Sequence, residues 1–223
     1  MIEISDALDS TAQWLHDEEL AGSRLVTAKA LEGQADATSA AKQLDGLTIV
    51  MRMLTGEIPQ AAMCETLNYL LIDAAYGRAV FQGRPRDAFT NPHSTMHGGW
   101  SATLLDSAMG CAVRTVLPAG RVFTTMDLMV RFIKAVSKKV TVLRAEGTVL
   151  HAGRRAVVAE GRLFGPDGTL YATATSSCIT LPSDGRAGFH ANNTGVTDEG
   201  SGAGDVRCVP GCARPIHDRA ERA

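Results

Sequence analysis

The chain has 223 residues, a formal net charge of -2 and 45 % hydrophobic residues, which is ordinary for a globular protein with a sizeable core. This charge balance gives no general attraction to nucleic acid or to an acidic membrane, so we expect neither as a partner. No apolar run approaches the roughly 20 residues of a membrane-spanning helix, and the acidic start of the chain lacks the basic region of a secretory signal.

Residues 1–43 form an N-terminal extension that we expect to be helical or flexible. An Ala-rich stretch after Glu32 allows either a second helix or a flexible connection to residue 44. Ahead of it, a few large apolar residues allow a short amphipathic helix, and they are Leu8, Trp14, Leu15 and Leu20.

The apolar pattern sharpens between residues 44 and 181, which we expect to form one domain. A helix over 47–54 ends at Gly56 and Pro59, and a loop over 91–97 leads into one long helix from Gly98 to about Leu117. The expected strands lie at 67–73 and 78–82, after Gly120 as far as Phe132, and at 140–150, 155–164 and 170–181. A single long helix followed by an antiparallel meander is an α+β plan, in which a curved sheet wraps around a buried helix.

The strand after Gly120 alternates in a way that predicts two faces. We expect four of its side chains on one face, and these are Met126, Leu128, Val130 and Phe132. We expect another four on the opposite face, and these are Thr125, Asp127, Met129 and Arg131.

The start of the long helix is suited to an oxyanion. Gly98 and Gly99 leave backbone amides bare at the positive end of the helix dipole. Asn91 and His97 lie just upstream and could meet the same point. A flexible turn before a helix is the simpler interpretation of the glycine pair, and the two polar neighbours favour the functional one.

Asp106 is the only charge in the otherwise small and apolar run 104–113. A carboxylate in a buried helix is paired, shifted in pKa or kept for function, so a structural role and a catalytic role both stay open. Eight residues separate Gly98 from Asp106, roughly 12 Å along a helix. The two groups can meet at one carbonyl only if two helices each supply half of a site, which predicts a symmetric oligomer, most simply a dimer.

The run Asn91–Trp100 followed by Leu104–Gly110 resembles the signature of the PaaI-type hotdog thioesterases and their acyl-CoA-hydrolysing relatives, over roughly residues 44–181. The resemblance implies a hotdog fold, a homodimer or homotetramer with sites at the dimer interface, and hydrolysis of an acyl-CoA thioester. Asp106 would be the nucleophile or general base, and Gly98 would supply the oxyanion amide. His97 and Asn91 would orient the thioester and water. Thr125 stands where relatives place a hydroxyl residue near the attacking water, although a β-branched strand residue with no special role is equally open.

The resemblance also implies where the nucleotide end of coenzyme A is held. The positions are Phe132, Lys134, Gly153, Arg154 and Arg155. Two departures from the family pattern affect the site. Ser94 stands where relatives commonly have glycine, which costs on the order of 1 kcal/mol if the position needs a positive φ, and Lys134-Ala135 replaces an Arg-Pro pair.

Two other functions are open on the same fold, an acyl-thioester dehydratase or hydratase and a non-catalytic acyl-CoA-binding regulator. The glycine pair and the mid-helix carboxylate favour hydrolysis, which needs no metal or cofactor because a thioester carbonyl is already activated. The sequence does not decide between an aromatic and a medium-chain acyl group.

Residues 182–223 contain few large apolar residues and no periodicity, so we expect a disordered tail. Cys208, Cys212 and His217 in this tail match no strong zinc pattern, and we expect no metal. The five cysteines of the chain are odd in number and lie mostly in apolar contexts, which favours a reducing compartment, and we expect the cytoplasm.

Overall fold

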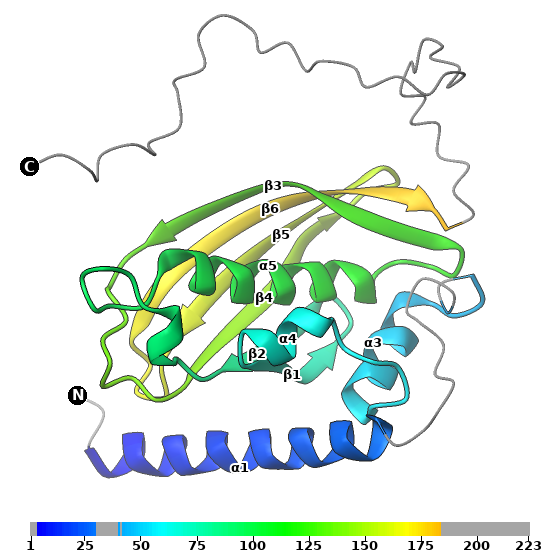
Figure 1. Ribbon diagram of the computed structural model, residues 1–223. Helices are drawn as coiled ribbons and strands as arrows, with labels where there is room; N and C mark the ends of the chain where they lie inside the picture. The colour runs from blue at the N-terminus through cyan, green and yellow to red at the C-terminus, as the bar shows by residue number, and fades with distance from the viewer. Residues whose placement is uncertain (1–3, 30–39, 41, 184–223) are drawn as a thin grey trace, which may run out of the picture. The chain divides into compact units, whose positions relative to one another are not determined.

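The structure is a computed structural model that describes residues 4–29, 40 and 42–183. Its helices are α1 (Ile4–Lys29), α3 (Gly46–Thr55), α4 (Ala62–Thr66) and α5 (Gly98–Thr115), with a 3-10 turn, η1, at Asp87–Phe89. Its strands are β1 (Tyr69–Ala75), β2 (Arg78–Gly83), β3 (Arg121–Phe132), β4 (Leu143–Ala152), β5 (Ala156–Phe164) and β6 (Leu170–Pro182). The strands form one antiparallel six-stranded sheet in the order β1-β2-β4-β5-β6-β3. Figure 1 shows this sheet curving around α5, which confirms the predicted α+β plan.

The observed elements differ from the predicted ones mainly at the ends of the chain and at strand starts. Helix α1 has 26 residues, so the short helix expected there was wrong in length. The strand expected at 67–73 begins at Tyr69, because Leu67 caps α4 (Ala62–Thr66) and Asn68 has a φ of 56°, outside the strand region. That helix has five residues, too few to show a helical period in the sequence. The tail was predicted to begin at residue 182, but Pro182 ends β6. Residues 184–223, with Cys208, Cys212 and His217, lie outside the described residues.

The core lies between α5 and the concave face of the sheet. Leu104, Leu105 and Met109 of α5 are fully buried against it. Strand β4 can approach the helix closely because it carries Gly147 there, where a Cβ atom would collide with the backbone of Ala108. This close contact fixes the rotation of α5 and leaves one stripe of the helix only half-buried, made of Ala102, Thr103, Asp106, Ser107, Gly110, Cys111 and Arg114.

Helix α1 packs on the other face of the sheet. Gln82 and Arg144 are cross-strand partners on β2 and β4, and their side chains contact α1. The Gln82 amide donates to the Trp14 carbonyl at 2.8 Å, and the Arg144 guanidinium lies 4.3 Å from the Trp14 ring centroid. In Figure 1 strands β1 and β2 lie between α1 and α5.

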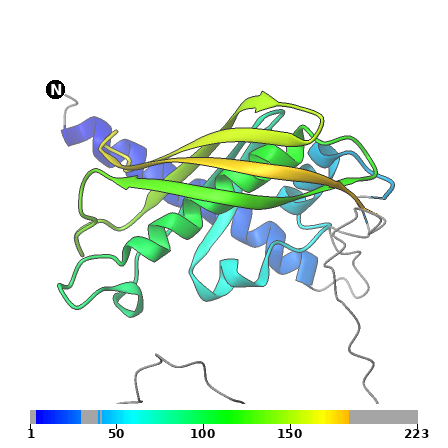
Figure 2. The same ribbon diagram turned by 90° about the horizontal axis from the view of Figure 1, so that it is seen from above.

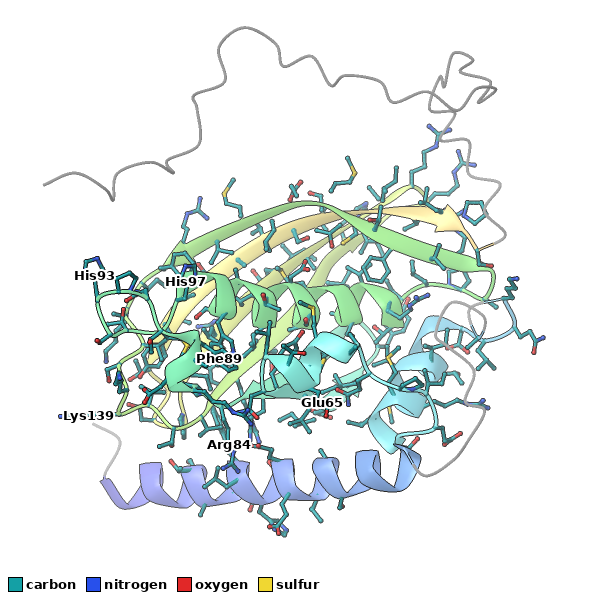
Figure 3. All side chains as sticks on the ribbon, in the orientation of Figure 1. Glu65, Arg84, Phe89, His93, His97 and Lys139 are labelled. Carbon is teal, nitrogen blue, oxygen red and sulfur yellow. The ribbon has the colours of Figure 1, made fainter. Side chains whose placement is uncertain are left out.

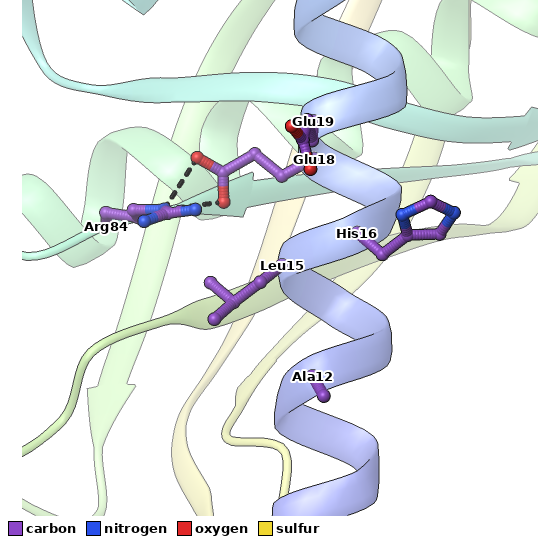
Figure 4. A pocket seen from close by; sticks show the side chains of 6 residues that line it. All are labelled: Ala12, Leu15, His16, Glu18, Glu19 and Arg84. Atoms are coloured by element: carbon purple, nitrogen blue, oxygen red, sulfur yellow. Dashed lines mark hydrogen bonds and ion pairs between the residues drawn. The ribbon is translucent and has the colours of Figure 1, made fainter.

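An open cleft lies along α1, on the side away from α5. Its lining residues are Ala12, Leu15, His16, Glu18, Glu19 and Arg84, shown in Figure 4. Glu18 pairs with Arg84 at 2.7 Å across the cleft. The cleft is therefore separated by the sheet from the helix that carries Asp106.

Strand β3 forms one edge of the sheet, as Figure 2 shows from above. Its apolar side chains are unusually exposed for a strand, with 65 % of Met126, 55 % of Met129 and 59 % of Phe132 accessible. Exposed apolar side chains on an open edge strand are typical of a surface that pairs with another chain.

Candidate active site

Asp106 lies at the middle of α5, on the half-buried stripe that faces away from the core. Burial raises the pKa of its carboxyl group above the ordinary value, and a hydrogen bond from Thr125 partly offsets this. The Thr125 hydroxyl donates to Asp106 Oδ1 at 3.3 Å. Among the described residues, Asp106 has no cationic partner. Its negative charge is therefore not compensated by an ion pair, which is typical of a carboxylate with a role in chemistry.

Thr125 reaches Asp106 because β3 contains a β-bulge. Thr125 pairs with Cys178 of β6, whereas Asp127 pairs with Ser177, so Met126 is an extra residue in the ladder. Thr125 and Leu128 therefore both face α5, since their partners Cys178 and Ser176 are both buried. The prediction that Thr125 lies on the face opposite to Leu128 and Phe132 was wrong, because strict alternation does not allow for the inserted residue.

The start of α5 is organised by His97. Its Nδ1 atom accepts a hydrogen bond from the Gly99 amide at 2.9 Å, which makes His97 the N-cap of the helix. An acceptor at Nδ1 leaves the proton of a neutral imidazole on Nε2. Among the described residues, the Gly98 amide donates to no protein acceptor. The site therefore has one free backbone donor and one imidazole donor at the same helix end.

Phe132 explains why a glycine is needed at the first position of α5. A Cβ atom at Gly98 would lie 2.8 Å from Cζ of the Phe132 ring. The structure thus brings together two predicted site residues, one at the helix start and one at the end of β3. The ring is 59 % exposed and packs against Gly98.

The loop before α5 is held by Asn91. Its side-chain oxygen accepts from the amides of His93 at 2.9 Å and Thr95 at 3.2 Å, and its side-chain nitrogen donates to the Thr95 hydroxyl at 2.8 Å. The side-chain amide of Asn91, predicted to be catalytic, therefore makes its hydrogen bonds within its own loop. Ser94 at the tip has a φ of 60°, so the position does require the left-handed conformation that suits glycine. Figure 3 labels two residues of this loop, His93 and His97.

The predicted nucleotide-binding residues fall into two groups. The Lys134 ammonium lies 5.7 Å from the Tyr171 ring centroid, near Phe132. Arg154 and Arg155 are exposed at the β4–β5 turn, where a Cβ atom at Gly153 would lie 2.9 Å from the Ala156 carbonyl oxygen. These two groups come from opposite ends of β3, since Arg121, the first residue of that strand, contacts the turn.

Arg121 is a residue that the sequence did not single out. Its Nη2 atom donates to the carbonyl oxygens of Arg154 and Thr180, both at 3.1 Å, and to the Thr180 hydroxyl at 2.6 Å. This contact holds the turn with Arg154 and Arg155 against β3 and β6. No local pattern marks Arg121, because its partners lie 33 and 59 residues away.

Two further structural features bear on the predictions. No helix among the described residues is long and apolar enough to cross a membrane. Within the same residues, no group of three or more His, Cys, Asp or Glu side chains could hold a metal ion.

Comparison with known proteins gives a family for this arrangement. Residues 93–172 match the family model of the thioesterase superfamily. No curated protein matches the chain at a significant level. The matched residues include the loop from His93 on, all of α5, strands β3, β4 and β5, and the start of β6.

Solved structures share the fold. One is a candidate thioesterase and phenylacetic acid degradation-related protein from Ralstonia eutropha JMP134, with 30 % identity over 58 % of this chain and 97 % of that one and a TM-score of 0.53. Another is a conserved protein from Pseudomonas aeruginosa, with 27 % identity over 55 % of this chain and 95 % of that one and a TM-score of 0.52. The E. coli PaaI protein from the phenylacetic acid degradation operon shares the fold at 19 % identity, over 55 % of this chain and 86 % of that one, with a TM-score of 0.50. The predicted hotdog fold and its PaaI type are confirmed, and the chain belongs to the thioesterase superfamily.

Proposed function

We propose that the protein hydrolyses an acyl-CoA thioester to a free acid and coenzyme A, with an aromatic or medium-chain acyl group. The observation that supports this most directly is the half-buried Asp106, which has a hydroxyl partner but, among the described residues, no cationic one. A carboxylate in this setting keeps its basicity and its negative charge available for a reaction.

In the proposed reaction the thioester carbonyl oxygen accepts hydrogen bonds from the Gly98 amide and the Nε2–H of His97. Both donors stabilise the negative charge that develops on that oxygen. Asp106 either removes a proton from water as it attacks the carbonyl carbon, or attacks that carbon itself and forms an anhydride that water opens. In both routes the C–S bond breaks and the thiolate leaves with its electron pair, to be protonated on coenzyme A.

Thr125 and Asn91 take different parts in this proposal. The Thr125 hydroxyl, 3.3 Å from Asp106, orients the carboxylate and the water beside it. Asn91 acts through the loop, because its side chain holds the turn that precedes His97. The family resemblance suggested a direct role for Asn91, and its contacts favour an indirect one.

A second copy of the chain is needed to complete each site. Helix α5 is continuous from Gly98 to Thr115, so Asp106 lies roughly 12 Å along the helix from the oxyanion donor of its own chain. The exposed apolar edge at β3 lies on the same side as both groups, because Thr125 contacts Asp106 and Phe132 contacts Gly98. We propose a dimer through this edge, in which Asp106 of one chain meets the Gly98 amide of the other.

Coenzyme A would then lie across the interface. Phe132 and Lys134 from one chain and Gly153, Arg154 and Arg155 from the other would hold its nucleotide end. Arginine recognises phosphate through paired hydrogen bonds, and the hydrogen bonds from Arg121 keep the turn in place for it. A cytoplasmic location and pairing of dimers into a homotetramer stay predictions.

The first experiment measures release of free thiol from a panel of aromatic, medium-chain and short-chain acyl-CoAs. We expect turnover with at least one aromatic or medium-chain substrate. Enoyl-CoA hydration measured on the same protein separates the dehydratase or hydratase alternative. Saturable binding without turnover of any acyl-CoA would instead favour the regulator.

The second experiment tests where the site lies. We expect Asp106→Ala and Gly98→Pro to be inactive alone, the second because proline removes the amide hydrogen. Co-refolded heterodimers should regain one intact site each, since both lesions fall in the other site. Gly98→Ala is the matched control, because it meets the same Phe132 ring but keeps the amide. Absence of recovery in samples shown to exchange subunits would place the site within one chain.

A further inference from the structure

The β-bulge in β3 has its own supporting contacts, and these come from residues outside the proposed reaction. Without the extra residue Met126, Thr125 would face away from α5, because neighbouring side chains of a strand alternate between faces. Extra residues in an edge strand can be accommodated in several ways, so something must hold this one in the conformation that directs Thr125 inward.

Two hydrogen bonds join the bulge at Asp127 to β6. The hydroxyl of Ser176, 1 % exposed, donates to the Asp127 carbonyl oxygen at 2.9 Å. The Asp127 carboxylate accepts from the Ser177 amide at 3.0 Å. The Ser176 bond comes from the buried face of β6. The Asp127 bond gives a hydrogen-bond acceptor to the Ser177 backbone amide, which lies opposite the bulge in the sheet. Together they tie the irregular part of β3 to a regular strand.

The same two strands form a row of contacts that ends at Asp106. The Ser176 hydroxyl lies 3.9 Å from the Cys178 thiol, and Cys178 is the cross-strand partner of Thr125. Thr125 in turn donates to Asp106. A shift of the bulge would therefore move Thr125 relative to Asp106 while leaving α5 and its core contacts in place.

We propose that Ser176 and Asp127 are positioning residues, which lock the β-bulge so that Thr125 faces Asp106. This inference rests on the proposed function for its effect on turnover, but its geometric part can be tested without turnover. Neither residue touches the substrate in this proposal. Both act through Thr125.

The variants are Ser176→Ala, which removes the buried donor, and Asp127→Ala, which removes the acceptor of the Ser177 amide. We expect each to lower kcat by roughly tenfold with KM little changed, because a reacting group is misplaced rather than lost. Asp127→Asn should rescue activity, since its side-chain oxygen still accepts. Thr175→Ala is the matched control on β6, because Thr175 faces the other side of the sheet opposite Met129, and it should be unaffected.

The pKa of Asp106 gives a readout that a purely structural role would not move. Because the Thr125 bond lowers this pKa, its loss should raise the pKa, and the acid limb of the kcat profile should move to higher pH. The same rise should appear in carboxyl ¹³C NMR titrations of Ser176→Ala, Asp127→Ala and Thr125→Ala. If Ser176→Ala fails to fold, Asp127→Ala reaches the same bulge from the exposed face.

A double-mutant cycle decides whether the residues act through Thr125. In a Thr125→Ala background, Ser176→Ala and Asp127→Ala should add little further loss. Additive losses, or an unchanged Asp106 pKa in both single variants, would overturn the proposal. If the wild-type protein hydrolyses no thioester, the proposed function is wrong. The NMR titration still tests the positioning role in that case, because a raised Asp106 pKa in the variants supports it and an unchanged pKa contradicts it.

Discussion

Helices α1 and α5 pack on opposite faces of the sheet. Each carries an aspartate with a shifted pKa, and the two shifts have opposite signs. The pKa of Asp106 on α5 is raised, because burial outweighs its one hydrogen bond from Thr125. Asp17 on α1 is also penalised by burial, but hydrogen bonds from Arg144 and Gln13 outweigh this and lower its pKa. Asp17 lies 2.7 Å from the Arg144 guanidinium.

The difference separates a structural carboxylate from a functional one. Asp17 has a cationic partner, so its charge stabilises the contact between α1 and the sheet. Asp106 has no cationic partner among the described residues, so the free-energy cost of burying its charge is not offset by an ion pair. A charge kept at such a cost is typical of a residue retained for chemistry.

The largest expected effect comes from Asp106→Asn. Hydrolysis should fall by roughly 10³-fold or more, since the reacting group is lost. The melting temperature at neutral pH should rise, because the folded pKa of Asp106 lies above its unfolded value and ionisation therefore destabilises the native state. Calorimetry from neutral to acidic pH should show this gain shrinking as wild-type Asp106 becomes protonated.

A melting temperature that falls at neutral pH, with activity lost, would contradict the comparison. It would mean that Asp106 stabilises the fold like Asp17. Retention of near-normal turnover in Asp106→Asn would remove its catalytic role altogether.

The same substitution on the other helix, Asp17→Asn, should have the opposite sign and leave activity intact. The Asp17 side chain keeps 34 % exposure, so solvent screening limits the expected loss to about 1 kcal/mol. Since the folded pKa of Asp17 is lowered, its contribution is present above the unfolded value and is lost as pH falls through the folded one. Chemical denaturation at neutral pH and at low pH measures both. An equal effect at both pH values would contradict the assignment.

The two helices also differ in how well the sequence predicted them. Helix α5 contacts the sheet through apolar residues and small ones such as Ala108, which give a recognisable buried pattern. Helix α1 contacts it through Trp14, Asp17 and Glu18, whose partners Gln82 and Arg144 are 64 or more residues away. Polar contacts between distant residues leave no local period, so the length and docking of α1 could not be predicted.

The candidate site shows the same limit. Asp106, Gly98 and His97 lie on one helix or its cap. The glycine pair at the helix start predicted the oxyanion donor, and the spacing along the helix predicted that Asp106 lies away from it. The face of Thr125 could not be predicted, because the bulge at Met126 is visible only in the pairing with β6. The loop role of Asn91 likewise depends on side-chain contacts with His93 and Thr95 that the sequence does not specify.

The smallest expected effect concerns the loop that leads into α5, where Ser94 has a φ of 60°. Replacing Ser94 by glycine removes the backbone strain of the folded state but gives the unfolded chain more conformational entropy. If the start of α5, like Asp106, is kept at a cost in stability, the free energy gained from the first effect should exceed the free energy lost through the second. We therefore expect Ser94→Gly to stabilise the protein by roughly 0.5 to 1 kcal/mol. Thermal unfolding measures the change.

Asn68 provides the matched contrast, because its φ of 56° is nearly the same. Its side chain donates to the Arg84 carbonyl at 2.9 Å and accepts from the Arg86 guanidinium at 2.6 Å. Asn68→Gly removes both bonds as well as the strain, so it should destabilise the protein by about 1 kcal/mol. Equal shifts in the two variants would show that backbone conformation alone sets the effect. A loss of stability in Ser94→Gly would mean that the loop before α5 is not strained, and that only Asp106 carries a stability cost in this site.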